Sequence, residues 1–69
     1  MIPQYVLIRA KVLALNKKQI CLEYKGMEKW VPIQCFNVWE QSQHEQRKYK
    51  QARTYDFRII NWWAQKEGW

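Results

Sequence analysis

Residues 5–15, YVLIRAKVLAL, decide the fold that this sequence predicts. The stretch is rich in β-branched and aliphatic residues, which favour a long strand. Side chains alternate between the two faces of a strand, so one face is polar in part and carries Tyr5, Leu7, Arg9, Lys11 and Leu13. The other face is continuously apolar, and we expect it to line the core through Val6, Ile8, Ala10, Val12 and Ala14.

Two turns after this strand separate two further strands. Residues 16–19, NKKQ, are polar and turn-compatible, and residues 20–24 alternate again. Gly26 supplies the positive φ of a tight hairpin, and a strand over residues 27–31 leads out of it. Pro32 removes a ladder donor, so that strand ends there or lies at a sheet edge. The first half therefore predicts a three-stranded meander.

The region after Pro32 is less regular. Residues 33–39 are apolar without a clear period, and we expect a short turn that leads into a fourth strand and completes a β-meander over residues 4–39. Residues 40–53, EQSQHEQRKYKQAR, predict an exposed basic loop, or at most a polar helix. A loop of this length is usually functional or mobile.

Residues 54–69 predict a last strand followed by a terminal helix. Residues 54–59 alternate, and Ile60, Trp63 and Ala64 then follow at helical spacing before Gly68, a helix stop. About two turns of helix are not stable alone in water, so this helix must dock on the sheet.

The fold class expected is therefore mainly β with a C-terminal helix (α+β). A chain of 69 residues holds only one domain, residues 1–69. The strands predict either a small bent antiparallel sheet or an SH3/OB-like barrel that the short helix closes.

Charge is the strongest compositional signal. The chain has 12 Lys and Arg residues against 6 Asp and Glu residues, for a net charge of +6. This excess favours a polyanionic partner: nucleic acid, an acidic protein face or an anionic membrane. No apolar run approaches the roughly 18 residues that span a bilayer, and the N-terminus lacks the pattern of a signal peptide. We therefore expect a soluble cytoplasmic protein without a membrane partner.

The sequence does not predict an enzyme. Catalysis needs a nucleophile with a base and an orienting group, or a metal. His44 is the only histidine, and no metal-ligand pattern or glycine-rich phosphate loop occurs. We expect no enzymatic activity, no metal and no cofactor. Cys21 and Cys35 lie in apolar stretches, where free thiols behave as small hydrophobes in a reducing setting.

Two segments are candidates for nucleic-acid contacts. In the polar loop, four basic residues surround one aromatic residue, a composition that neutralises phosphates and stacks a base. These loop residues are Arg47, Lys48, Tyr49, Lys50 and Arg53. The alternative is a solvated mobile loop that charge keeps soluble.

A sheet face that mixes cations with aromatic rings is the second candidate, because small barrels hold single strands in this way. Its residues are Arg9, Lys11, Lys29 and Trp30. The alternative is the ordinary wet side of a half-buried sheet.

Five tryptophans exceed what so small a core houses. Trp63 lies on the inward face of the predicted helix and is expected in the core. Trp39, Trp62 and Trp69 are candidates for surface contacts. Trp69 has an alternative role, the hydrophobic contact that follows a glycine cap.

Two motifs carry a resemblance to a known family. Residues 30–32 read WVP, and residues 62–68, WWAQKEG, follow after the polar loop. The chain resembles small uncharacterised phage and mobile-element proteins with a W-[IV]-P motif, a variable charged loop and a W-x-A-x-K-x-G helix. The resemblance implies a short β-meander fold and a bacterial host cell. It also adds one function class, inhibition of a bacterial defence complex by occlusion, as anti-CRISPR proteins do.

Two functions are therefore open. One is nucleic-acid binding, single-stranded or duplex, through the basic loop and aromatic residues. The other is inhibition of a host defence protein, with exposed tryptophans such as Trp62 as anchors and the basic loop against an acidic surface. Exposed aromatics interleaved with cations favour the first, and segregated aromatics favour the second. Both are compatible with a homodimer, since an exposed sheet edge and surplus tryptophans promote self-association.

Overall fold

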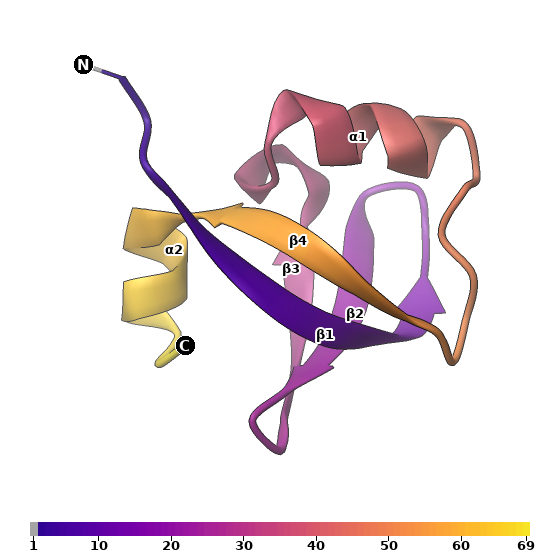
Figure 1. The fold of residues 1–69 in the computed structure, drawn as a ribbon, viewed down its shortest axis with the longest axis horizontal. Helices are drawn as coiled ribbons and strands as arrows, with labels where there is room; N and C mark the ends of the chain where they lie inside the picture. The colour runs from indigo at the N-terminus through magenta and orange to yellow at the C-terminus, as the bar shows by residue number, and fades with distance from the viewer. Residues whose placement is uncertain (1) are drawn as a thin grey trace.

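The computed structural model describes residues 2–69 and contains a four-stranded antiparallel sheet (Figure 1). The elements in chain order are β1 (Tyr5–Leu15), β2 (Gln19–Tyr24), β3 (Met27–Pro32), a 3-10 turn (Ile33–Cys35), α1 (Val38–Glu45), β4 (Thr54–Ile60) and α2 (Asn61–Lys66). The spatial order β3-β2-β1-β4 confirms the predicted three-stranded meander of the first half and the α+β class.

β1 bends the sheet because two partners share its length. Residues 5–11 pair with β4, and residues 11–15 pair with β2 across an irregular register between Val12 and Ala14. Figure 1 shows β1 and β4 crossing in front of β2 and β3. The bent open sheet is therefore confirmed. The barrel alternative is wrong, because β3 and β4 lie at opposite ends of the strand order and do not pair with each other.

Both predicted hairpin turns form, for identifiable reasons. Asn16 Oδ1 accepts hydrogen bonds from the backbone N–H groups of Lys18 at 2.9 Å and Gln19 at 2.8 Å. Lys25 and Gly26 have φ values of 53° and 75°, the positive pair that a two-residue hairpin turn requires. β3 is an edge strand, which confirms the inference from Pro32.

The fourth strand predicted within residues 33–39 does not form. After the 3-10 turn, Phe36 makes only a single β-bridge, to Ile59. Asn37 then starts a helix, because its side chain accepts from the N–H of Trp39 at 3.0 Å and caps α1. The meander therefore ends at Pro32, and only residues 46–53 of the predicted loop 40–53 are irregular.

The segment after β3 also protects an edge of the sheet. Next to the Phe36–Ile59 bridge, the N–H of Asn37 donates to the carbonyl of Arg58 at 3.1 Å. An uncovered edge strand exposes unpaired backbone groups to other chains. Residues 36–40 occupy the outer edge of β4, so β3 is left as the exposed edge.

One buried cluster holds these elements together. Its members are Ile8, Ala10, Val12, Ile20, Leu22, Val31, Cys35, Phe36, Tyr49, Phe57, Ile59, Trp63 and Ala64. The expectation that the alternate residues of β1 line the core is confirmed for its three central positions. Trp63 is buried as predicted.

The C-terminus returns onto α2. Gly68 has a φ of 84°, its N–H donates to the Gln65 carbonyl at 3.2 Å, and the N–H of Trp69 donates to the Ala64 carbonyl at 2.7 Å. These two bonds form a Schellman cap. The Trp69 ring meets Trp63 edge-on at 5.8 Å, which confirms the packing role of Trp69 over a surface role.

Candidate functional site

Three basic side chains are paired with acids. Arg9 contacts Asp56 at 3.3 Å, Lys29 contacts Glu67 at 3.9 Å, and Arg58 contacts Glu40 at 3.0 Å. Within residues 2–69, the other lysines and arginines form no ion pair. The unpaired cations therefore carry the net positive charge of the surface.

Six of these unpaired cations come from two segments at the same end of the molecule. They are Lys17 and Lys18 in the β1–β2 turn, and Arg47, Lys48, Lys50 and Arg53 in residues 46–53. We call this group the basic end. In Figure 1 the turn and residues 46–53 both lie on the side away from α2.

Backbone contacts fix the position of the basic end. The N–H of Ala52 donates to the Val12 carbonyl at 2.7 Å, and the N–H of Val12 donates to the Arg53 carbonyl at 2.9 Å. A half-open cleft of about 590 Å³ lies between the β1–β2 turn and the C-terminal half of α1, and Lys17 and Arg47 both line it. Residues 46–53 are thus held beside the end of β1.

Lys11 lies next to this group, because it is in register with Thr54 on β4. Its other register partner is Glu23 on β2, an acid that offsets part of its charge. Lys11 is therefore a flanking residue of the basic end.

Tyr49 does not have the surface role predicted for it. Its side chain is 7% exposed, and its ring packs 5.0 Å from the rings of both Tyr55 and Phe57. Tyr49 is the only large apolar residue of its segment, so it fills the space beneath that segment. A ring in this position cannot stack on a base outside the core.

The structure places three of the four residues predicted for a sheet face on one exposed face: Arg9, Lys11 and Trp30. Lys11 is in register with Glu23 and Glu23 with Glu28, which lies on the same face of β3 as Trp30. Strand alternation turns Lys29 to the other face of β3, where it contacts Glu67 just beyond α2. Arg9 pairs with Asp56 across the strands. The face therefore keeps Arg9, Lys11 and Trp30 without Lys29, and the acids Asp56, Glu23 and Glu28 on the same face offset its positive charge.

The exposed tryptophans are distributed over several elements. Trp62 is 58% exposed and belongs to α2, a helix that lies on the side of the molecule away from the basic end (Figure 1). Trp30 is exposed on β3. Trp39, on α1, lies 5.8 Å from the guanidinium of Arg58 in a cation–π contact. Trp39 is therefore interleaved with a cation, Trp30 shares its sheet face with Arg9 and Lys11, and Trp62 is segregated on α2.

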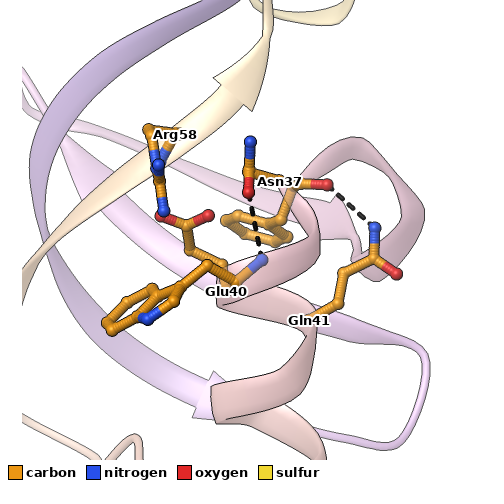
Figure 2. A network of polar contacts seen from close by, with 6 residues as sticks. Asn37, Glu40, Gln41 and Arg58 are labelled. Atoms are coloured by element: carbon orange, nitrogen blue, oxygen red, sulfur yellow. Dashed lines mark hydrogen bonds and ion pairs between the residues drawn. The ribbon is translucent and has the colours of Figure 1, made fainter.

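Sequence reasoning missed a buried acid at the edge of β4. Glu40 is 2% exposed, and its Oε2 atom accepts from the backbone N–H of Arg58 at 3.3 Å and from Arg58 Nε at 3.0 Å. Figure 2 shows the two side chains meeting beside the Asn37 cap. In the sequence Glu40 begins a polar run, and nothing there distinguishes it from exposed neighbours.

A second half-open cleft, of about 330 Å³, surrounds this pair. Its lining residues are Leu7, Trp39, Glu40, Tyr49, Tyr55, Asp56 and Arg58. We call it the Glu40 cleft. Glu40 Oε1 and the Tyr49 hydroxyl are both buried and have no hydrogen-bond partner.

The comparisons with known proteins add no relative: no family model, no curated protein and no solved structure matches this chain. The phage-type resemblance therefore stays a prediction. Within residues 2–69, no helix is long and apolar enough to cross a membrane. The same residues contain no group of three or more His, Cys, Asp or Glu side chains placed to hold a metal ion.

Proposed function

We propose that this protein is a non-catalytic nucleic-acid-binding module whose basic end contacts the phosphate backbone. The observation that supports the proposal is that six cations without acidic partners are gathered from two separate segments. Lysine and arginine bind nucleic acid by neutralising phosphates and releasing counterions. An unpaired cation serves this purpose better than one already held by a carboxylate, such as Arg9 or Lys29.

The test compares two variants of equal net charge. The first replaces Lys17, Lys18, Lys48 and Lys50 with Gln, and the second replaces Arg9, Lys25, Lys29 and Lys66 with Gln. Each set removes four of the 12 basic residues, so the net charge falls from +6 to +2 in both. Overall charge is thereby matched. The two sets differ in the location of the lost cations and in ion pairing, because only Arg9 and Lys29 of the second set are paired with acids.

Binding is measured by fluorescence anisotropy with labelled DNA and RNA at two salt concentrations. We expect wild-type affinity to fall steeply between about 50 and 200 mM salt. The first variant should bind weakly, and its log–log salt slope should be smaller by about 3 to 4. The second should stay close to wild type. Equal losses in both variants would make binding a property of total charge and would remove the basic end from the proposal.

A second candidate function is inhibition of a bacterial defence complex by occlusion, of the anti-CRISPR kind. The exposure of Trp62 on α2, away from the basic end, and of Trp30 on β3 favours it, because exposed tryptophans act as anchors in protein interfaces. The test adds the protein to a reconstituted CRISPR effector and follows target cleavage. Inhibition that the double variant W30A/W62A loses would support this function, and undiminished cleavage with the wild-type protein would contradict it.

A further inference from the structure

We propose that the Glu40 cleft binds one unpaired nucleobase of a single-stranded nucleic acid, stacked on Trp39 with its polar edge at Glu40 and Tyr49. This proposal rests on the proposed function and adds to it the form of nucleic acid that is recognised.

Two unpaired buried atoms in one cleft are the main evidence. Glu40 is 2% exposed and Tyr49 is 7% exposed, and both line the cleft. Glu40 Oε1 and the Tyr49 hydroxyl lack any hydrogen-bond partner in the protein. Buried polar groups are almost always hydrogen-bonded, so an unpaired donor and an unpaired acceptor on two residues that line the same cleft point to a ligand with both functions.

The chemistry of these two groups matches the edge of a base. Burial and the neighbouring Glu40 carboxylate raise the pKa of the Tyr49 hydroxyl, which therefore stays protonated and able to donate. A carboxylate oxygen only accepts. Nucleobases present N–H groups together with ring nitrogens or carbonyl oxygens along one edge.

Charge balance favours a neutral ligand over a cationic one. The guanidinium of Arg58 contacts Glu40 Oε2 at 3.0 Å and already neutralises that carboxylate. The second carboxylate of the cleft, Asp56, is paired with Arg9. A lysine or arginine from a partner protein would meet no free negative charge there, whereas a base needs none.

The wall of the cleft provides a stacking surface. Trp39 is 53% exposed and carries Arg58 at 5.8 Å from its ring. Proteins that bind single strands stack bases on such exposed aromatic side chains. In a duplex the bases are already stacked and paired, so the cleft distinguishes single strands from duplexes.

The cleft is also connected to the basic end. Tyr49 lies between Lys48 and Lys50, both of which are exposed. The backbone N–H of Lys50 donates to the Tyr55 hydroxyl at 2.9 Å, and Tyr55 lines the cleft. A strand with one base in the cleft therefore has cations nearby for its flanking phosphates.

The experiment uses three variants of the full chain: W39L, Y49F and W62L. W62L is the matched control, because Trp62 is as exposed as Trp39 and lies on α2. Each protein is titrated by anisotropy with a single-stranded 10-mer, the same 10-mer with abasic positions, and the corresponding duplex. Thermal unfolding verifies that each variant is folded, and Y49F removes only a hydroxyl group without a protein partner.

We expect wild type to prefer the single strand with bases over the abasic strand. W39L should lose about tenfold in affinity for the single strand. Y49F should lose about fivefold. Duplex binding should be unchanged in both, and W62L should match wild type throughout.

Several outcomes would overturn the proposal. If W39L and Y49F bind the single strand as wild type does, the cleft holds only water, although the basic end still binds nucleic acid. If both variants lose duplex and abasic binding equally, the cleft contacts the backbone and not a base. If wild type binds no nucleic acid at low salt, the proposed function fails together with this inference.

Discussion

Arg58 Nε donates to Glu40 Oε2 across 3.0 Å, and the backbone N–H of Arg58 reaches the same oxygen at 3.3 Å (Figure 2). The pair is asymmetric, because the Glu40 side chain is buried whereas that of Arg58 is partly exposed. It joins α1 to β4 at the edge that residues 36–40 cover. Removing one partner should therefore have different consequences from removing an exposed ion pair.

Replacing Arg58 with Met should lower the free energy of unfolding by about 1.5–3 kcal/mol, because Glu40 then lacks its charged partner inside the protein. Urea unfolding followed by circular dichroism measures the change. The control is Arg9→Met, which breaks a pair that is exposed on both sides and should cost less than about 1 kcal/mol. Similar losses in the two variants would show that Glu40 is not buried as described.

Replacing Trp63 with Ala should destabilise the fold by about 3–5 kcal/mol, because it empties a large volume beneath α2 and removes the contact with Trp69. For a domain of this size such a loss leaves little native protein, so Trp63→Phe serves as the milder variant. Trp62→Ala, at an exposed position of the same helix, should change stability by about 0.5 kcal/mol or less. An unmoved melting temperature in both Trp63 variants would refute the docking of α2.

Replacing Gly68 with Ala should cost about 1–2 kcal/mol, because its φ of 84° is unfavourable for a residue with a Cβ. Apart from Gly68 itself and its two chain neighbours, no heavy atom lies within 4 Å of the position of an added Cβ, so the cost is conformational and not a clash with the rest of the protein. Gly68→Asn should cost less, since asparagine tolerates this region. Thermal unfolding compares the two, and an Ala variant as stable as wild type would exclude the Schellman cap.

Stability should decrease in alkaline solution. Burial raises the pKa of the Cys35 thiol, and burial together with Glu28 raises that of Cys21, from an ordinary value of 9.0. The pKa of Tyr49 is raised from 10.0. The unfolded chain releases these protons at lower pH than the native protein, so stability is complete below about pH 8 and falls as the pH rises.

Urea unfolding between pH 7 and pH 11 tests this dependence. In Tyr49→Phe, the decrease above about pH 10 should be smaller than in wild type, because one group with a raised pKa is absent. Identical slopes in the two proteins would show that the Tyr49 hydroxyl ionises as readily in the native state as in the unfolded chain.

The strands and turns were predictable because they depend on local chemistry. Residues adjacent in sequence determine four of these features: the alternation of β1, the Asn16 turn, the positive φ at Gly26 and the Gly68 cap. The start of α1 was missed although its signal was local. Asn37 is a favoured N-cap residue, but the apolar residues around it suggested a strand.

The burial of Tyr49 and Glu40 was not predictable in the same way. Both belong to a polar segment whose composition is typical of exposed residues. Both are buried by β4. Its Phe57 ring packs on Tyr49, and its Arg58 side chain pairs with Glu40 across 18 residues of sequence. Such contacts with another segment cannot be predicted from the periodicity of the polar segment itself.

The pattern of residues along the chain was sufficient to predict the α+β class, the terminal helix and the basic character of the surface. It also predicted the four strands of the sheet, together with one within residues 33–39 that does not form. Alternation, turn chemistry and net charge are properties of neighbouring residues and of composition. Contacts between segments far apart in sequence decide which cations are unpaired and which polar groups line a cleft. Ion pairs and burial exist only once those segments pack together, so the basic end and the Glu40 cleft became visible only in three dimensions.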